Sequence, residues 1–296
     1  MKVSNEVLEN FKIWMESEFL SPETISCYFR TVRMFCLGKN IKEFDLDFFE
    51  NLKIILKEQG LTLKTIGRYV VAIKKFLFWI KIKFNIEYVD LDKVRCKKGK
   101  LPKPDFLERE EIYSIRQLPI NNPYDLRARA LFEFLLNTGC RISEALGINR
   151  KEINWDKSEV EVLGKGNKKR IVFLGDSEIW LKRYLSERKD DSCFLFINQY
   201  CRKLHRRDGY FIIKHLGKAA GLRPIKPHLL RSTFCTYLIW TGTDPRTVQE
   251  LMGHDDVETT LRYYSAVTHD RMREAHTKLS DTFKRVPIRI LNYLIR

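Results

Sequence analysis

The sequence predicts a mainly α-helical protein with one small β-hairpin or sheet, divided into two domains. Apolar residues recur at helical spacing through most of the 296 residues. Two short segments in the second half alternate polar and apolar side chains, as strands with one buried face do. Residues 95–106 are basic and rich in proline and glycine, which is typical of an extended linker between domains.

Residues 1–94 are expected to form a bundle of four helices. The first helix is indicated by apolar residues three or four positions apart, namely Val7, Leu8, Phe11, Trp14 and Met15. Ser21 followed by Pro22 indicates the start of the second helix, with serine as the cap and proline in the first turn. Residues 46–57 and 62–84 supply the other two helices. Short connections between helices favour a compact bundle.

Residues 107–285 are expected to form the larger domain. The first predicted elements are helices at 108–117 and 122–138 and strands at 159–162 and 170–173. Gly164 to Lys169 joins the strands and suits a tight turn, so we predict a hairpin with a lysine-rich tip. Helical patterns then continue from Ser177 almost to the end.

The charge of the chain favours a polyanionic partner. Fifty-four lysines and arginines outnumber thirty-eight acidic residues, giving a net charge of +16. Nucleic acid is the commonest partner of such proteins, although a solvated basic surface would give the same count.

The cysteines and the apolar segments indicate a cytoplasmic protein that does not enter a membrane. The seven cysteines are odd in number and contain no C-x-x-C pair, which favours reduced thiols over disulfides or a zinc site. No uninterrupted apolar run is long enough to span a bilayer, and the N-terminus has no apolar signal core.

The first cluster of chemically useful residues follows a predicted helix break at Gly139. Arg141 is expected in the first turn of the next helix, with Glu144 three residues later on the same face. A surface Arg–Glu pair would have the same spacing and is common. This segment alone therefore leaves both interpretations open.

Two further clusters contain basic groups. Lys165 lies at the glycine-flanked hairpin tip, where a lysine can reach a phosphate or protonate a leaving oxygen, although most turn lysines are only solvated. His228 and Arg231 lie three residues apart in a helix that Pro227 begins, and we expect them on one face. Together they would place a proton-handling group beside a phosphate clamp, although such residues also serve as helix caps.

The fourth cluster combines His254, directly after a predicted helix end at Gly253, with the adjacent Tyr263 and Tyr264. A tyrosine considered alone is more often a packing residue than a nucleophile. The four clusters together nevertheless supply what phosphoryl transfer requires: arginines for the phosphate oxygens, an attacking oxygen and a proton donor. No grouping has the spacing of a metal site, so we expect neither a metal nor another cofactor.

These motifs resemble those of the tyrosine recombinases, the family of phage integrases and Xer-type enzymes. The family blocks T-G-x-R-x-S-E-L, G-K-G-x-K-x-R, H-x-L-R, L-G-H and T-T-x-x-Y are similar to residues 138–146, 164–170, 228–231, 252–254 and 259–263. The sequence departs from the pattern at several positions. Ala145 separates Glu144 from Leu146, and Ser232 follows Arg231 where histidine is frequent. None of these departures removes a catalytic group.

The resemblance implies an N-terminal helical core-binding domain of the SAM-like type, a basic linker and a C-terminal tyrosine-recombinase catalytic domain. It also implies cleavage of double-stranded DNA through a 3′-phosphotyrosine and strand exchange through a Holliday junction, by four protomers on two sites. The compact length favours an Xer-like role, but both chromosome-dimer resolution and integration or excision of a mobile element remain open.

The resemblance assigns six catalytic residues: Arg141, Lys165, His228, Arg231, His254 and Tyr263. Tyr263 would be the nucleophile, because the family spacing places it nine residues after the histidine. Lys165 would be the general acid and His228 the base. Glu144 would orient the helix that carries Arg141.

Other basic residues and the tail are secondary candidates. Possible DNA contacts in the fourth helix and the linker are Lys64, Arg68, Lys75, Lys97, Lys98 and Lys100. The exposed side of the fourth helix is expected to carry Lys74 as well. Residues 286–296 are apolar with interspersed arginines, and they would dock into a neighbouring protomer or pack on their own domain.

Two rival functions remain at this point. A type IB topoisomerase uses the same chemistry but rejoins the original strand, and the compact helical N-terminal domain argues against it. A DNA-binding accessory protein of the same fold would not cut at all. The complete set of catalytic residue types argues against that alternative.

Overall fold

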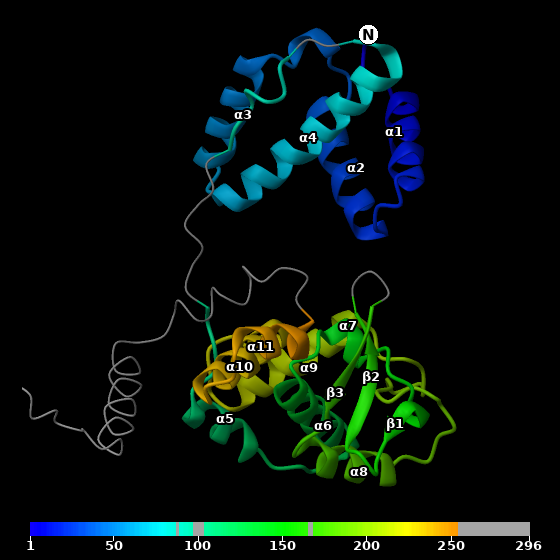
Figure 1. The fold of residues 1–296 in the computed structure, drawn as a ribbon, viewed down its shortest axis with the longest axis vertical. Helices are drawn as coiled ribbons and strands as arrows, with labels where there is room; N and C mark the ends of the chain where they lie inside the picture. Colours follow the sequence, from blue (N-terminus) through cyan, green and yellow to red (C-terminus); the bar gives the residue numbers. More distant parts are fainter. Residues whose placement is uncertain (87–88, 97–103, 165–167, 254–296) are drawn as a thin grey trace, which may run out of the picture. The chain divides into compact units, whose positions relative to one another are not determined.

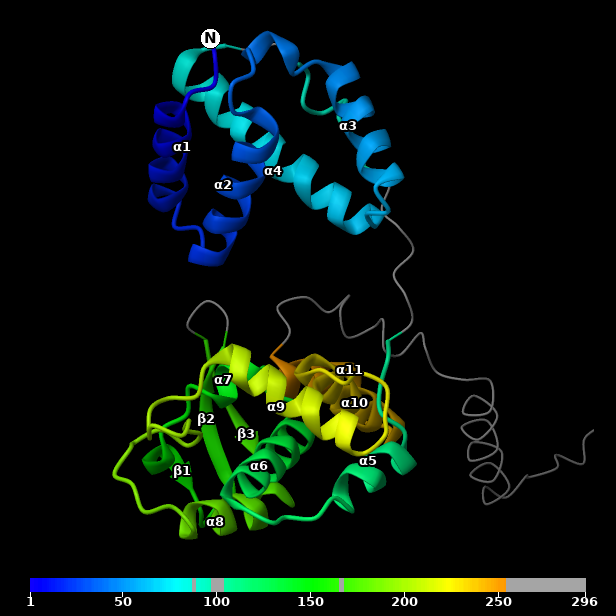
Figure 2. The same cartoon turned by 180° about the vertical axis from the view of Figure 1, so that it is seen from behind.

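The computed structural model describes residues 1–86, 89–96, 104–164 and 168–253. The chain divides into two compact units, Met1–Leu101 and Pro102–Arg296, which Figures 1 and 2 show from opposite sides. In the described ranges the protein is mostly helical with one three-stranded sheet, which confirms the predicted fold class. The predicted limits of the linker stay a prediction, because residues 97–103 lie outside the described ranges.

The first unit contains four α-helices and a short 3-10 helix. They are α1 (Asn5–Ser17), α2 (Pro22–Cys36), η1 (Ile41–Glu43), α3 (Leu46–Glu58) and α4 (Leu63–Phe84). Each α-helix follows a residue whose side chain accepts a hydrogen bond from a backbone N–H of the first turn; these residues are Ser4, Ser21, Asp45 and Thr62. The four predicted helices are therefore confirmed, and their starts are set by local caps.

Helix α4 supplies much of the core of the first unit. Phe76 and Trp79 pack against Phe11 of α1, with ring centroids 5.2 and 5.5 Å away. The expectation that Lys74 and Lys75 lie on the exposed face of α4 was wrong in part, because both are half-buried. Lys74 donates to the carbonyl of Val94, and the Lys75 ammonium lies 4.8 Å from the ring of Trp14. Lys64 and Arg68 are exposed, as predicted.

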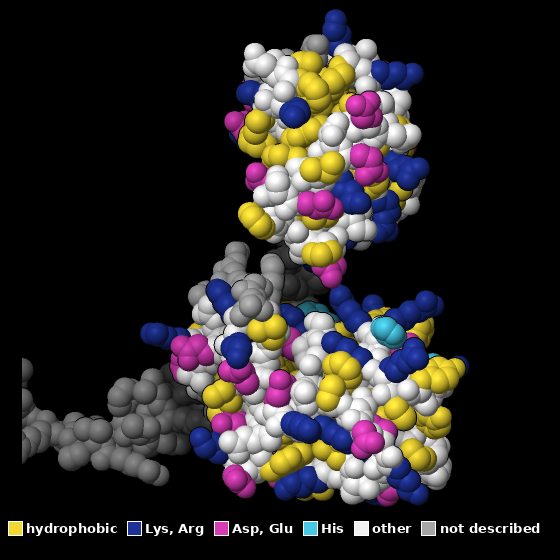
Figure 3. All heavy atoms as spheres, turned by 90° about the vertical axis from the view of Figure 1, so that its right-hand side faces the viewer, with side chains coloured by type: hydrophobic (Ala, Val, Ile, Leu, Met, Phe, Trp, Pro, Cys, Tyr) yellow, Lys and Arg dark blue, Asp and Glu magenta, His cyan; other side chains and the backbone are white. Residues whose placement is uncertain are grey.

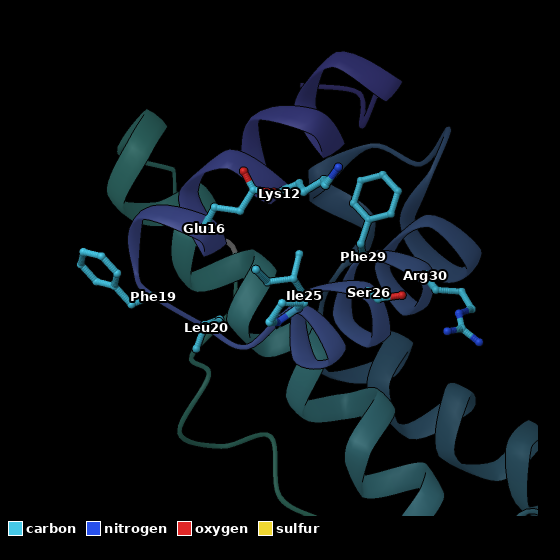
Figure 4. Close-up of a pocket in the computed structure, with 9 residues that line it drawn as sticks. Lys12, Glu16, Phe19, Leu20, Ile25, Ser26, Phe29 and Arg30 are labelled. Carbon is cyan, nitrogen blue, oxygen red and sulfur yellow. The ribbon is translucent and has the colours of Figure 1, made fainter. Parts of the chain in front are cut away.

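A groove of about 710 Å³ lies between the end of α1 and the start of α2, and Figure 4 shows its lining. Its walls combine apolar side chains such as Ile25 with Lys12 and Glu16. Phe19, in the connecting loop, is 95% exposed. Figure 3 likewise shows apolar side chains interspersed with lysine and arginine on this unit.

The second unit contains the sheet and the remaining helices. Its elements are α5 (Arg109–Arg116), α6 (Pro123–Thr138), α7 (Ile142–Ala145), η2 (Arg150–Glu152), β1 (Ile153–Asn154), β2 (Glu159–Leu163), β3 (Lys169–Phe173), α8 (Ser177–Ser186), α9 (Arg206–Ala219), α10 (Pro227–Trp240) and α11 (Pro245–Met252). None of the described helices is long and apolar enough to cross a membrane.

The sheet is antiparallel with the strand order β1-β2-β3. Strands β2 and β3 form the predicted hairpin, in which Val162 is paired with Arg170 and Leu163 with Lys169. Strand β1 was not predicted, because two residues are too few for an alternating pattern. The hairpin tip at Lys165 lies outside the described residues.

Helix α6 is buried along most of its length and packs against α8 and α10. Two charged residues of α6, Arg129 and Glu133, are buried, and hydrogen bonds to α5 compensate for the loss of water around them. Arg129 donates to the carbonyls of Ile115 and Arg116 at the end of α5, and Glu133 accepts two hydrogen bonds from Arg116. These contacts satisfy the last carbonyls of α5 and fix that helix on α6.

The prediction of continuous helices after Ser177 was wrong for residues 187–205. This segment is irregular, with single bridges from Phe194 to Asn149 and from Ile197 to Lys203. Arg188 organises its start by donating to the Asp190 carboxylate and to the carbonyl of Phe194. Side-chain hydrogen bonds and single bridges of this kind leave no periodic signal in the sequence.

Candidate functional site

Arg141 lies at a sharp turn between α6 and α7. Gly139 ends α6 in the left-handed region at φ 61°, and a Cβ on it would lie 2.3 Å from the ring of Phe234. Only glycine fits such a position without strain. Arg141 is extended (φ −68°, ψ 144°) and occupies the N-cap position of α7, so it precedes the helix and does not lie in its first turn as predicted.

Glu144 is the central acceptor of this site. Its side chain is only 3% exposed, yet it accepts hydrogen bonds from the backbone N–H of Arg141 (2.8 Å), from Arg141 Nη1 (2.7 Å) and from Arg170 Nη2 (2.8 Å). Burial alone would raise the pKa of the carboxyl, but the hydrogen bonds from Arg170 and Arg141 hold it below its ordinary value. Glu144 is therefore a buried acceptor, and Arg141 is its half-buried partner, so the pair is not fully solvated.

Replacing Glu144 with glutamine should destabilise the protein by about 1 to 3 kcal/mol at neutral pH, because the largely buried Arg170 and the half-buried Arg141 would lose their counter-charge. A carboxyl whose folded pKa is lowered contributes stability above its unfolded pKa and loses it as the pH falls through the folded pKa. The difference between wild type and Glu144→Gln in urea unfolding should therefore shrink from about pH 7 to about pH 3. A difference that is independent of pH would contradict this assignment.

Arg231 lies in α10, which begins at Pro227 as predicted. It is 3% exposed and donates from Nη1 to the carbonyl of Gly139 (2.8 Å) and from Nη2 to that of Met252 (2.5 Å). These carbonyls belong to the C-terminal ends of α6 and α11, which carry partial negative charge. Burial, helped by the Arg141 cation, lowers the pKa of Arg231 to about 10, so the residue stays charged at neutral pH.

His228 begins the same helix but has a different environment. It is exposed, whereas Arg231 three positions later in α10 is buried. The physical reason is that the Arg231 side chain reaches inward to two helix ends, while His228 stays at the accessible start of the helix.

Three arginines converge on the end of α11. Leu251, Met252 and Gly253 have consecutive backbone carbonyls, which accept hydrogen bonds from Arg170 (3.2 Å), Arg231 (2.5 Å) and Arg141 (3.1 Å) respectively. Carbonyls at the end of a helix have no partner within it, so these side chains satisfy them. Gly253 ends the helix in the left-handed region at φ 59°, as predicted, and it directly precedes His254.

The structure therefore brings together two of the six predicted catalytic residues, Arg141 and Arg231, and it describes a third, His228. Lys165, His254 and Tyr263 lie outside the described residues, as do Lys97, Lys98 and Lys100 of the linker and the tail at 286–296. The attachment points of two of them are described: Gly164 precedes Lys165, and Gly253 precedes His254.

Arg170 belongs to this cluster, although it was not selected from the sequence. The only signal was its position as the last residue of the G-K-G-x-K-x-R block. In the alternating pattern of a strand, a charged residue is expected to face solvent, but the Arg170 side chain is only 12% exposed. With it, the cluster contains three arginines, Arg141, Arg170 and Arg231, but only one carboxylate, that of Glu144. Such an imbalance in a partly buried site favours binding of an anion.

The model of the phage integrase family matches residues 105–271, more than half of the chain. The chain belongs to the phage integrase family. Tyrosine recombinase XerD of Oceanobacillus iheyensis is 35% identical over 232 residues, covering 75% of this chain and 77% of that protein. Tyrosine recombinase XerA of Thermococcus onnurineus is 31% identical over 290 residues, covering 94% and 96%. The chain is thus a site-specific tyrosine recombinase, as the sequence motifs predicted.

A solved structure supports the fold of this recombinase. The XerH site-specific recombinase bound to the palindromic difH substrate matches with a TM-score of 0.68 at 24% identity, covering 86% of this chain and 77% of that one. At this identity the match speaks for the fold alone. The function therefore rests on the family match and the relatives.

Proposed function

We propose that this recombinase cleaves and rejoins double-stranded DNA at specific sites through a 3′-phosphotyrosine formed by Tyr263. The observation that carries the proposal is the pair Arg141 and Arg231, fixed beside each other on the ends of α6 and α11. Among the described residues, no carboxylate lies within ion-pair distance of Arg231. A scissile phosphate would supply the missing negative charge.

The proposed reaction conserves the number of phosphate ester bonds. The Tyr263 oxygen bonds to phosphorus as the bond from phosphorus to the 5′ oxygen breaks, and the tyrosine proton passes to His228. Lys165 donates a proton to the departing 5′ oxygen. Arg141, Arg231 and His254 stabilise the charge that develops on the non-bridging oxygens. The exposed position of His228 leaves it accessible to a tyrosine that approaches from solvent.

The second half of the reaction is the reverse of the first. A 5′ hydroxyl of a partner duplex attacks the phosphotyrosine and releases Tyr263, which completes strand exchange through a Holliday junction. The phosphotyrosine retains the energy of the original phosphodiester, so the proposed reaction needs no ATP. The arginines provide the positive charge that a metal ion would otherwise supply.

Strand exchange between two sites needs several active sites, and we propose a tetramer of this chain on two DNA duplexes in the cytoplasm. The exposed Lys64 and Arg68 on α4 suit phosphate contacts, whereas Lys75 is half-buried against Trp14 and is a weaker candidate. We propose that Lys97, Lys98 and Lys100 of the linker also contact DNA. Residues 286–296 form the tail, which docks on a neighbouring protomer or packs on its own domain. A tail that docks on a neighbour and a tail that packs on its own domain both remain open.

The experiment that tests the function is covalent trapping followed by strand exchange. The protein is incubated with fragmented DNA of its source organism in the presence of a metal chelator and quenched with detergent. Protein-linked fragments are then sequenced. We expect adducts with one common sequence at the cut end. Absence of adducts on both intact and nicked DNA, with DNA binding retained, would favour the non-cutting alternative.

The DNA site recovered by trapping then allows an assay that distinguishes recombinase activity from topoisomerase activity. Two copies are placed on one supercoiled plasmid, and a single copy serves as the control. Recombinant products that require both copies are expected, whereas relaxation with one copy and no recombinants would contradict the proposal. The position of the site also decides the biological role. A single chromosomal locus indicates chromosome-dimer resolution, and the ends of a mobile segment indicate integration or excision.

A further inference from the structure

We propose that Arg170 is a positioning residue for the phosphate clamp: it holds Arg141 through Glu144 and holds the turn that leads to His254. The inference rests on the proposed function, in which Arg141 and His254 contact the scissile phosphate. It adds to that function a residue on the hairpin strand β3 that would act without touching the substrate.

The contacts of Arg170 extend to three separate segments. Its Nη2 donates to Glu144 Oε2 at 2.8 Å, and its Nε donates to the carbonyl of Leu251 at 3.2 Å. A Cβ on Gly253 would lie 3.0 Å from its Cδ, and a Cβ on Gly164 would lie 3.5 Å from its Nη1. The side chain is therefore packed closely against the end of α11 and lies near the base of the hairpin tip.

Each of these segments leads directly to a predicted catalytic residue. Glu144 binds both the backbone N–H and the guanidinium of Arg141. Gly253 precedes His254 in the chain. The hydrogen bonds of Arg170 thus connect the first catalytic arginine with the turn before the histidine. A shift of about 1 Å in such groups is enough to reduce a rate about 100-fold.

The charge environment separates Arg170 from the arginines that would bind phosphate. Burial alone would lower the pKa of the Arg170 guanidinium, but its carboxylate partner Glu144 raises that pKa above the ordinary value. Arg231, in contrast, donates only to carbonyls in the described hydrogen bonds, and its pKa is lowered. A bound anion would therefore stabilise the charged Arg231 side chain more than the Arg170 side chain, which Glu144 already neutralises.

Geometry also explains why arginine is needed at this position. The planar guanidinium donates to Glu144 and Leu251 at the same time, from two nitrogens in a fixed relation. A lysine has a single nitrogen at its end and would contact one of the two acceptors well. A methionine would fill much of the same volume and contact neither.

The test uses single-turnover cleavage of a nicked duplex that carries the site recovered by trapping, at saturating DNA. Arg170→Met should cleave about 100-fold more slowly than wild type, and Arg170→Lys about 10-fold more slowly, with DNA affinity changed less than about threefold. The matched control is Lys169→Met, which removes a charge from the neighbouring residue. Lys169 is exposed and paired with Glu161, so its replacement should leave the rate unchanged.

A second substrate separates the phosphate clamp from the proton donor. It carries sulfur in place of the 5′ bridging oxygen, because a thiolate leaves without protonation. Arg170→Met should remain slow on this substrate, whereas Lys165→Ala should regain most of its rate. Recovery of Arg170→Met would show that Arg170 acts through Lys165 and would overturn the inference. Failure of Lys165→Ala to recover would instead contradict the proposed general acid.

Thermal unfolding of each variant completes the test. If Arg170→Met does not fold, Arg170→Lys decides the matter, since it keeps the charge next to Glu144. A wild-type cleavage rate in either folded variant would overturn the proposal. A slow rate in folded Arg170→Lys together with unchanged Lys169→Met would support it.

Discussion

Replacing Tyr263 with phenylalanine is expected to abolish the covalent protein–DNA adduct completely, whereas Tyr264→Phe should leave it intact. Phenylalanine has the same ring but lacks the oxygen that bonds to phosphorus, so no slower route to the adduct remains. The two tyrosines are adjacent, and the choice between them rests on the nine-residue interval between His254 and Tyr263. The neighbouring variant is therefore the most closely matched control that the chain offers.

The measurement is the yield of protein-linked DNA after detergent quenching, together with DNA affinity. Affinity should be the same for wild type and both variants, because the removed hydroxyl is one small group in a large basic surface. Loss of the adduct in Tyr264→Phe alone would show that the assigned register is wrong by one residue. Adducts in both single variants would mean that another side chain is the nucleophile.

The parts of the fold that were predicted from the sequence depend on local chemistry. Ser21 before Pro22 caps a helix in the structure as its residue type suggests. Gly139 and Gly253 end helices with positive φ. The hairpin followed from alternating side chains on either side of a glycine-rich turn. Each of these signals lies within a few residues of the element that it determines.

The parts that were missed depend on contacts between distant segments. The sequence left open whether Arg141 and Glu144 form a surface pair, and it did not indicate that Arg170 from another element also pairs with the buried Glu144. The position of Arg170 next to Leu251 spans 81 residues of sequence. The irregular segment at 187–205 is held by a hydrogen bond from Arg188 within the segment and by a bridge from Phe194 to the distant Asn149, and neither leaves a periodic pattern.

The end of α11 shows how the fold and the proposed chemistry are connected. The carbonyls of Leu251, Met252 and Gly253 have no partner within the helix, and three arginine side chains satisfy them. The same contacts hold Arg141 and Arg231 at Gly253 and Met252, where α11 ends. In the proposed mechanism, the helix end therefore positions the arginines that bind the scissile phosphate. Replacing any one of the three arginines, with the other two retained, should raise the activation free energy of DNA cleavage more than it lowers the free energy of unfolding.

Arg231→Lys offers the strongest test of that idea, and cleavage should fall about 1000-fold although the charge is retained. A lysine cannot donate to the carbonyls of Gly139 and Met252 together, nor present two parallel N–H groups to a phosphate. One buried carbonyl would lose its partner, which costs about 1 to 3 kcal/mol of stability and leaves a folded protein.

The matched control for this substitution is Arg223→Lys in the same unit. Arg223 is 39% exposed at its side chain and pairs with Asp105 and Glu111, so the same chemical change there should alter the cleavage rate by less than about twofold. Both variants are compared by single-turnover cleavage of the nicked site and by thermal unfolding. Cleavage by folded Arg231→Lys within about tenfold of wild type would mean that charge alone suffices at this position. The two hydrogen bonds that fix Arg231 between the helix ends would then have no part in catalysis.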